Sequence, residues 1–139
     1  MKDLKTLTIL FRTLKSVENQ IREDIKRYGL NTTEFGVLEV LYHRGPMSIQ
    51  VVKDKVLIAA SSMSYVIDVL EKKGYIKRIR HDKDKRSFLL TLTDDGNTKM
   101  TEIYPLHVLS MRERLDVLGK DEEKLQELLK KLGKAKKKT

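Results

Sequence analysis

Apolar residues recur at spacings of three and four along the first part of the chain, which is typical of an amphipathic helix with one buried face. The series runs from Leu4 to Ile25, and Gly29 follows where a helix can end. The sequence therefore predicts a helix over residues 4–28. At 1.5 Å per residue it is roughly 35 Å long, more than one small domain needs. We expect part of it to pack against a second subunit; a purely intramolecular core helix is the alternative.

Two shorter helices are predicted next, because capping residues stand in front of each apolar series. Asn31 or the threonine after it can cap the first, and Glu34 lies three residues beyond Asn31, as in a capping box. This helix should end near Gly45, which a proline follows. Ser48 can cap a third, shorter helix, which ends at an apolar corner over residues 56–58.

The stretch over residues 59–96 predicts a helix, a strand, a charged turn and a second strand. One face of this helix is apolar at positions i, i+3, i+4 and i+7. The opposite face carries mostly short hydrogen-bonding side chains, where Lys, Glu or Ala would favour a helix more strongly. We interpret that face as a contact surface. Its residues are Ser61, Ser62, Ser64, Tyr65 and Asp68.

A basic hairpin should follow. Gly74 suits the end of the helix, a first strand begins at Ile76, and Phe88–Leu92 alternate between two faces. Residues 81–86 between the strands include no apolar side chain, so the tip should project into solvent or against a polar partner. From Lys72 to Arg86 there are eight Lys or Arg and two Asp residues, a net charge of +6.

Two helices are predicted for the rest of the chain. Thr93 can cap the first, with two aspartates in its opening turn where the helix dipole favours acids. Pro105 lacks an amide hydrogen and its ring crowds the preceding turn, so we expect a kink or a break there. Gly119 should end this helix, and Asp121 should cap the last one. No internal repeat is present.

The charge balance favours a polyanionic partner. The chain of 139 residues has a net charge of +9 and a pI of about 9.7, with 40% hydrophobic and 35% charged residues. This composition is typical of one globular domain. Residues 130–139 contain six Lys and no acid. Because these lysines have no predicted scaffold, we interpret them as a solubilising tail that adds a salt-sensitive, non-specific attraction to nucleic acid.

Several classes of protein are excluded by what the sequence lacks. Without cysteine there is no disulfide, thiol nucleophile or thiolate redox sensor. Charges interrupt the N-terminal segment too often for a signal peptide, and no apolar run approaches the ~20 residues that span a bilayer. We therefore expect a cytoplasmic protein with no membrane partner.

Catalysis is not predicted. The three histidines are scattered without metal-ligand spacing, and the sequence has no phosphate-binding glycine loop and no nucleophile elbow. Asp82 and Asp84 could form a carboxylate pair, but on an exposed basic turn both would be ionised and solvated. The sequence indicates neither an enzyme nor a cofactor or metal.

In the order and spacing of its segments, the sequence resembles the MarR family of bacterial transcriptional regulators over nearly its whole length. No single segment is specific. The matching segments are Asn31-Thr32 before Phe35, Val37-Leu38, Ser61-Ser62-Met63-Ser64, Ile67, Leu70-Glu71, Gly74-Tyr75-Ile76, Arg78, Asp84-Lys85-Arg86 and Leu92-Thr93-Asp94-Asp95-Gly96.

The resemblance implies a mainly α fold with a small antiparallel β-hairpin wing, a winged helix-turn-helix between N- and C-terminal dimerisation helices. The parts would be residues 1–28 for dimerisation, 30–96 for DNA binding, and 97–139 for dimerisation with the basic tail, in one structural domain. Such proteins are homodimers that place one recognition helix per subunit in the major groove of a pseudo-palindromic operator. Here residues 60–73 would be that helix.

Specific DNA contacts follow from the resemblance. In the family a wing-tip arginine enters the minor groove and an aspartate two residues earlier holds it; Arg86 and Asp84 match these positions. A guanidinium suits the narrow, electronegative groove of A·T-rich DNA. Lysines beside it would bind phosphates, and the polar helix face would meet base edges. The predicted contacts are Ser61, Ser62, Ser64 and Tyr65 in the helix, and Arg78, Arg80, Lys83, Asp84, Lys85 and Arg86 in the wing.

Alternative interpretations remain at the helix. Ser61 and Ser62 could serve only as helix caps, and Tyr65 could pack on a neighbouring side chain. For the protein as a whole, the family suggests a dimeric repressor that a small aromatic or lipophilic compound releases from its operator. An architectural DNA-binding protein without ligand input is the alternative.

The ligand would lie between the dimerisation helices and the DNA-binding region, in a cavity of flexible and flat side chains. The same residue types at helical spacing also form ordinary core. The candidate ligand-binding residues are Phe11, His43, Tyr104, His107 and Met111.

Overall fold

The computed structural model describes residues 2–57, 62–80, 83 and 87–135. Most of these residues are helical, as predicted, and a small antiparallel sheet completes the fold. The elements in order are α1 (Lys5–Lys26), α2 (Thr32–Arg44), β1 (Met47–Ser48), α3 (Ile49–Lys55), α4 (Met63–Lys72), β2 (Ile76–Arg80), β3 (Phe88–Leu92), α5 (Asp94–Leu115), the 3-10 segment η1 (Asp116–Asp121) and α6 (Glu122–Lys134).

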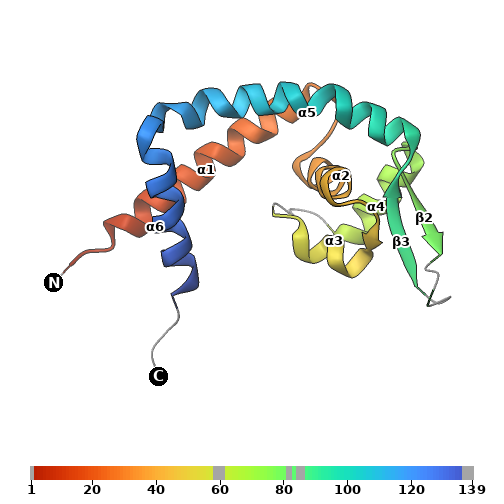
Figure 1. Cartoon of the computed structure of the whole chain (residues 1–139), viewed down its shortest axis with the longest axis horizontal. Coiled ribbons are helices and arrows are strands. Elements are labelled where there is room, and N and C mark those ends of the chain that lie inside the picture. The colour runs from red at the N-terminus through yellow and green to blue at the C-terminus, as the bar shows by residue number, and fades with distance from the viewer. Residues whose placement is uncertain (1, 58–61, 81–82, 84–86, 136–139) are drawn as a thin grey trace.

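The elements form two regions joined by α5 (Figure 1). At one end α2, α3, α4 and the strands gather into a lobe, which we call the winged lobe. From there α5 runs beside α1, and α6 turns away from the end of α5. The guanidinium of Arg114 donates to Gln20 Oε1 at 2.9 Å and to the carbonyl and hydroxyl oxygens of Ser16, so polar contacts join α5 to α1.

Three predicted helix caps are present and one is not. Asn31 Oδ1 accepts from Glu34 N at 2.8 Å, and Asn31 N donates to Glu34 Oε1 at 3.0 Å, which completes the capping box. Ser48 and Thr93 also cap their helices. Asp121 occupies the N-cap position of α6, but its side chain accepts no capping hydrogen bond, so that prediction was wrong. It follows η1 with helical backbone angles, which differ from the extended conformation of a typical cap.

The start of α6 is fixed by an ion-pair cluster instead. Arg112 donates to Asp116 at 2.5 Å and to both carboxylate oxygens of Glu122, at 2.6 and 3.1 Å. Hydrogen bonds from this guanidinium lower the pKa of Glu122. Gly119 lies within η1 at φ +50°, where the chain turns from α5 toward α6.

The sheet has a third strand that the sequence pattern does not indicate. Its order is β1-β3-β2, with Met47 and Arg78 on either side of Leu90 in antiparallel register. The β1 strand is only two residues long, too short to show an alternation of apolar and polar positions. The predicted hairpin of β2 and β3 is confirmed.

Helix α5 continues through Pro105 from Asp94 to Leu115. The helix is therefore not broken at the proline. Proline removes one helical hydrogen bond, at a cost of about 3 kcal/mol. Buried contacts secure the helix on both sides of it. Met100 and Ile103 lie in the core before Pro105, and His107 is buried just after it.

The hydrophobic core lies in the winged lobe and against the adjoining parts of α1 and α5. Its most deeply buried side chains include Ile25, Val37, Leu38, Val52, Val66, Ile67, Leu70, Leu90 and Met100. The first half of α1 and all of α6 contribute no buried residue. No helix in the described part of the chain is long and apolar enough to cross a membrane.

The junction between the wing and α5 requires glycine at one position. Thr93 N donates to the carbonyl of Tyr75 at 3.0 Å, and Thr93 Oγ1 donates to the carbonyl of Gly74 at 2.5 Å. These bonds bring the first turn of α5 so close to the segment before β2 that a Cβ on Gly96 would lie 2.0 Å from the Tyr75 carbonyl oxygen.

We predict that Gly96→Ala lowers the free energy of unfolding by about 2 kcal/mol or more, because the clash is with backbone and cannot be relieved by a rotamer change. Thermal or urea unfolding monitored by circular dichroism measures this. Gly133→Ala is the matched control, since a Cβ at this position of α6 would meet no atom within 4 Å. Helix propensity should stabilise that variant by up to about 1 kcal/mol. Equal stability of the two variants would contradict the close approach.

Candidate nucleic-acid interface

Helix α4 presents one face to the core and another to solvent, as its sequence predicts. Met63, Val66, Ile67 and Leu70 are buried. The predicted contact residues Ser62, Ser64 and Tyr65 are exposed, and so is Asp68. Ser61 lies outside the described residues.

The alternative roles for Ser62 and Tyr65 are not seen. Ser62 occupies the N-cap position of α4, yet its side chain makes no capping hydrogen bond. Tyr65 leaves 67% of its surface accessible, so packing does not account for its presence. Both side chains are available to a partner along this face.

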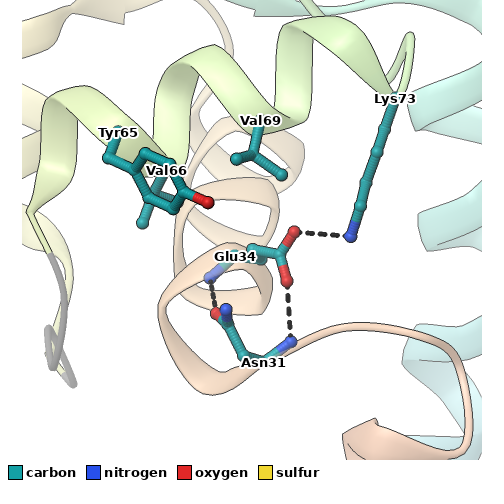
Figure 2. Close-up of a pocket in the computed structure, with 6 residues that line it drawn as sticks. All are labelled: Asn31, Glu34, Tyr65, Val66, Val69 and Lys73. Carbon is teal, nitrogen blue, oxygen red and sulfur yellow. Dashed lines mark hydrogen bonds and ion pairs between the residues drawn. The ribbon is translucent and has the colours of Figure 1, made fainter.

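One flank of α4 is tied to the beginning of α2 (Figure 2). Lys73, just after the helix, places Nζ 2.6 Å from Glu34 Oε2 and 3.3 Å from the carbonyl oxygen of Gly29. Glu34 is 5% exposed and also closes the capping box, so its carboxylate holds two elements at once. A hollow of about 160 Å³ lies between the helices, beside Tyr65 and Val69.

The other flank of α4 is tied to the wing. Arg78 on β2 donates from Nε to Glu71 Oε1 at 2.9 Å and from one terminal nitrogen to Asp68 Oδ1 at 3.1 Å. The sequence predicts Arg78 as a DNA contact, whereas the structure directs its guanidinium to two carboxylates of α4. The sequence pattern did not indicate these two acids as partners of the wing.

The remaining wing residues keep the basic surface that the sequence predicts. Lys77 and Arg80 on β2 and Lys83 beyond it are exposed. Asp84, Lys85 and Arg86 lie outside the described residues. Exposed cations on a two-stranded projection beside a polar helix face are suited to a phosphate backbone next to a groove.

The five candidate ligand-binding residues do not form one group. His43 and Tyr104 pack edge to face with ring centroids 4.6 Å apart, and the ring centroids of His107 and Tyr104 are 6.4 Å apart. Phe11 is exposed on α1 and Met111 is half-buried on α5, and neither borders a described hollow. Three of the five therefore form an aromatic cluster between α2 and α5.

His107 makes a buried hydrogen bond to Asp24 that sequence reasoning missed. Its Nδ1 lies 2.7 Å from Oδ2 of Asp24, and its ring lies 4.7 Å from that of Phe35. Asp24 and His107 are both buried. A signal for this contact was available, because Asp24 is a charged residue inside the apolar series of α1, next to Ile25. Buried carboxylates are rare unless they are paired.

A hollow of about 170 Å³ opens beside His107 and Phe35. Ile21 of α1, Gly36 and Glu39 of α2 and Leu57 also border it. A second hollow of about 300 Å³, which includes His43, shares Glu39 and Leu57 with the first. Both hollows are apolar in part: the smaller lies where α1 and α5 meet α2, and the larger lies between α2 and α3 within the winged lobe.

The phenol of Tyr104 should remain a hydrogen-bond donor at neutral pH. Burial raises its pKa above the ordinary value, and the negative charge of Glu39 raises it further. In the described part of the chain, no three His, Asp or Glu side chains lie close enough together to bind a metal ion.

The comparisons with known proteins agree with this arrangement. The sequence model of the MarR family matches residues 30–88. The HTH-type transcriptional regulator YkoM of Bacillus subtilis is 42% identical over 90% of this chain and 82% of its own length. MhqR, an HTH-type transcriptional regulator of the same organism, is 37% identical over 95% of this chain and 92% of its own length.

Solved structures share the whole fold. AbsC, a MarR family transcriptional regulator from Streptomyces coelicolor, superposes with a TM-score of 0.80 at 23% identity, over 96% of this chain and 95% of its own. A mutant MarR from Escherichia coli, complexed with operator DNA, gives 0.76 at 23%, over 94% and 99%. NadR in complex with 4-hydroxyphenylacetate gives 0.77 at 22%, over 98% and 97%. At these identities the likeness is evidence for the fold alone.

Proposed function

The chain belongs to the MarR family of DNA-binding helix-turn-helix transcriptional regulators, which are not enzymes, and from that premise we propose that it is a homodimeric repressor. It would bind a pseudo-palindromic operator in the cytoplasm and leave it when a small aromatic or lipophilic compound binds. The observation that carries the proposal is the exposed polar face of α4, held between two ion-paired flanks beside a basic wing.

Helix α4 is suited to reading the major groove. That groove of B-DNA is about 12 Å wide and accepts an α-helix. Hydroxyl groups on Ser62 and Ser64 can donate to or accept from base edges, and the exposed ring of Tyr65 can contact a thymine methyl group. Ser61 directly precedes Ser62 in the sequence, and we include it among the proposed base contacts.

The wing would supply most of the electrostatic attraction. Arg80, Lys83 and Lys85 would bind phosphates, which gives affinity without sequence preference. Arg86 would enter the minor groove, with Asp84 orienting it, by the family resemblance. Affinity and base preference would thus come from different elements of the winged lobe.

The long helices would form the dimer. In the single chain a stripe of apolar side chains on α1 faces solvent, and α6 adds a second stripe without burying any residue. Such surfaces in a soluble protein usually mark an interface. We assign residues 1–28 and 97–139 to dimerisation, with residues 30–96 as the DNA-binding region. The exposed apolar residues include Leu4, Leu7, Phe11, Leu14, Leu109, Leu128, Leu129 and Leu132.

The hollows beside His107 and His43 are the proposed effector site. The hollow beside His107 lies between the dimerisation helices and the winged lobe, so a molecule bound there would contact both. The hollow that includes His43 adjoins it at Glu39 and Leu57. NadR, which shares the fold, was crystallised with 4-hydroxyphenylacetate, which makes an aromatic effector a reasonable first choice. An architectural protein without ligand input is the alternative, and an effector assay distinguishes the two.

Selection from a randomised duplex library tests DNA recognition. We expect the purified protein to enrich an inverted repeat whose half-sites lie about one helical turn apart, roughly 34 Å, or a multiple of it. Because each subunit of a two-fold dimer reads one half-site, a single half-site would contradict the dimer. If no sequence is enriched, the protein is not a sequence-specific regulator.

The variant Leu14→Asp tests the dimer. Leu14 is 50% exposed on the apolar stripe of α1, so a carboxylate there should leave the protomer folded but repel the partner's apolar surface. Light scattering should then report a monomer where the unchanged protein is a dimer. Val51→Asp is the matched control, since Val51 is 40% exposed on α3 of the winged lobe. A dimer that persists in Leu14→Asp would remove this stripe from the interface.

An effector panel of phenols, quinones and salicylate-like acids tests ligand input. At least one compound should raise the melting temperature, because a ligand that binds only the folded state stabilises it, and should weaken binding to the selected duplex. Glu39→Leu should alter both responses, since Glu39 borders both hollows, whereas exposed Glu102→Leu should not. If no compound changes either quantity, the architectural alternative is favoured.

A further inference from the structure

The position of Arg78 in β2 directs its side chain toward α4. Side chains alternate along a strand, so Ile76, Arg78 and Arg80 share one face. Ile76 is buried in the core at the base of the wing. Arg78 lies one step farther along the same face, opposite Leu90 of β3, and reaches Asp68 and Glu71.

The two carboxylates are spaced to receive one guanidinium. Asp68 and Glu71 are three residues apart, which places them side by side on α4. The planar guanidinium offers donors along two edges in a fixed geometry, and here Nε binds one acid and a terminal nitrogen binds the other. A lysine has a single point charge and would not hold both in this way.

Arg78, when bound to these two carboxylates, is poorly suited to contact a DNA phosphate. One arginine between two carboxylates leaves a local charge of −1, which repels the DNA backbone. Withdrawing Arg78 to a phosphate would leave Asp68 and Glu71 unneutralised beside the same DNA. The bridge instead joins the two elements that the proposed function brings to different grooves.

We propose that Arg78 is a positioning residue that fixes the wing against the recognition helix, so that α4 and the wing tip reach the major and minor grooves together. The inference rests on the proposed function for its DNA readout. Partly exposed ion pairs contribute little to overall stability, so variants at this bridge should remain folded. Their effect should appear in DNA binding and in the local order of the wing.

The first measurement is the affinity of each variant for the duplex that the unchanged protein selects, over a series of salt concentrations. Arg78→Ala should weaken binding about tenfold without changing the slope of log affinity against log salt. Lys83→Ala is the comparison, because loss of one phosphate contact lowers that slope by about one. A slope reduced by about one in Arg78→Ala would overturn the proposal and make Arg78 a phosphate contact.

The double variant Asp68→Asn/Glu71→Gln separates positioning from charge by the sign of its effect. It removes two negative charges near the DNA, so stronger binding is expected if Arg78 acts only through its charge. If Arg78 positions the wing, the same variant should bind more weakly. The exchanged pair Glu71→Arg/Arg78→Glu keeps the net charge and should recover part of the affinity lost in Arg78→Glu alone. Stronger binding by the double variant, or no recovery by the exchange, would overturn the proposal.

Amide hydrogen exchange provides a second readout that needs no DNA. Arg78→Ala should accelerate exchange in β2 and leave α2 unchanged, because only the wing loses its link to α4. Unchanged exchange in β2 would overturn the bridge as a positioning contact. If the unchanged protein selects no duplex, the proposed function fails, and the exchange rates still decide whether Arg78 orders the wing.

Discussion

Burial of the apolar stripe of α4 is the constraint on which the rest of the winged lobe depends. Ile67 and Leu70 are fully buried and belong to the same hydrophobic core as Val37 and Leu90. Burying side chains of this size stabilises a fold by about 2 kcal/mol each. Because a helix has fixed angular spacing, burying this stripe leaves Ser64, Tyr65 and Asp68 no orientation but outward. The exposure of the contact surface is therefore a consequence of how the opposite face of α4 packs in the core.

Ion pairs then set details that apolar packing leaves free. A hydrophobic contact has no direction, so apolar packing alone permits small shifts and rotations of a helix against its neighbours. Lys73 on one flank and Arg78 on the other bind acids through directional hydrogen bonds. The buried hydrogen bond between Asp24 and His107 joins α1 to α5 in the same directional manner. Directional contacts thus occur where one element must keep its orientation relative to another.

Much of the fold could be predicted from sequence, because periodicity and capping are local. The helices, the hairpin and the capping box of Asn31 with Glu34 all follow from residues a few positions apart. The strand of Met47 and Ser48 could not be predicted, since two residues carry no period. The predicted cap at Asp121 was wrong because the preceding backbone is already helical. In the candidate site, exposure of the α4 face was predictable, but the partners of Arg78 lie seven and ten residues away and depend on tertiary packing.

The junction at Thr93 has a mechanical consequence. Strand β3 ends at Leu92 and α5 begins at Asp94, so a single capping residue joins them. That residue is itself bonded to Gly74 and Tyr75, which lie just before β2, so the junction is held closely against the base of the wing. Helix α5 is 22 residues long and continuous through its proline, and thus acts as a stiff lever about 33 Å long. A tilt of roughly 3° about its far end moves the base of the wing by close to 2 Å over that length, a large fraction of the length of a hydrogen bond.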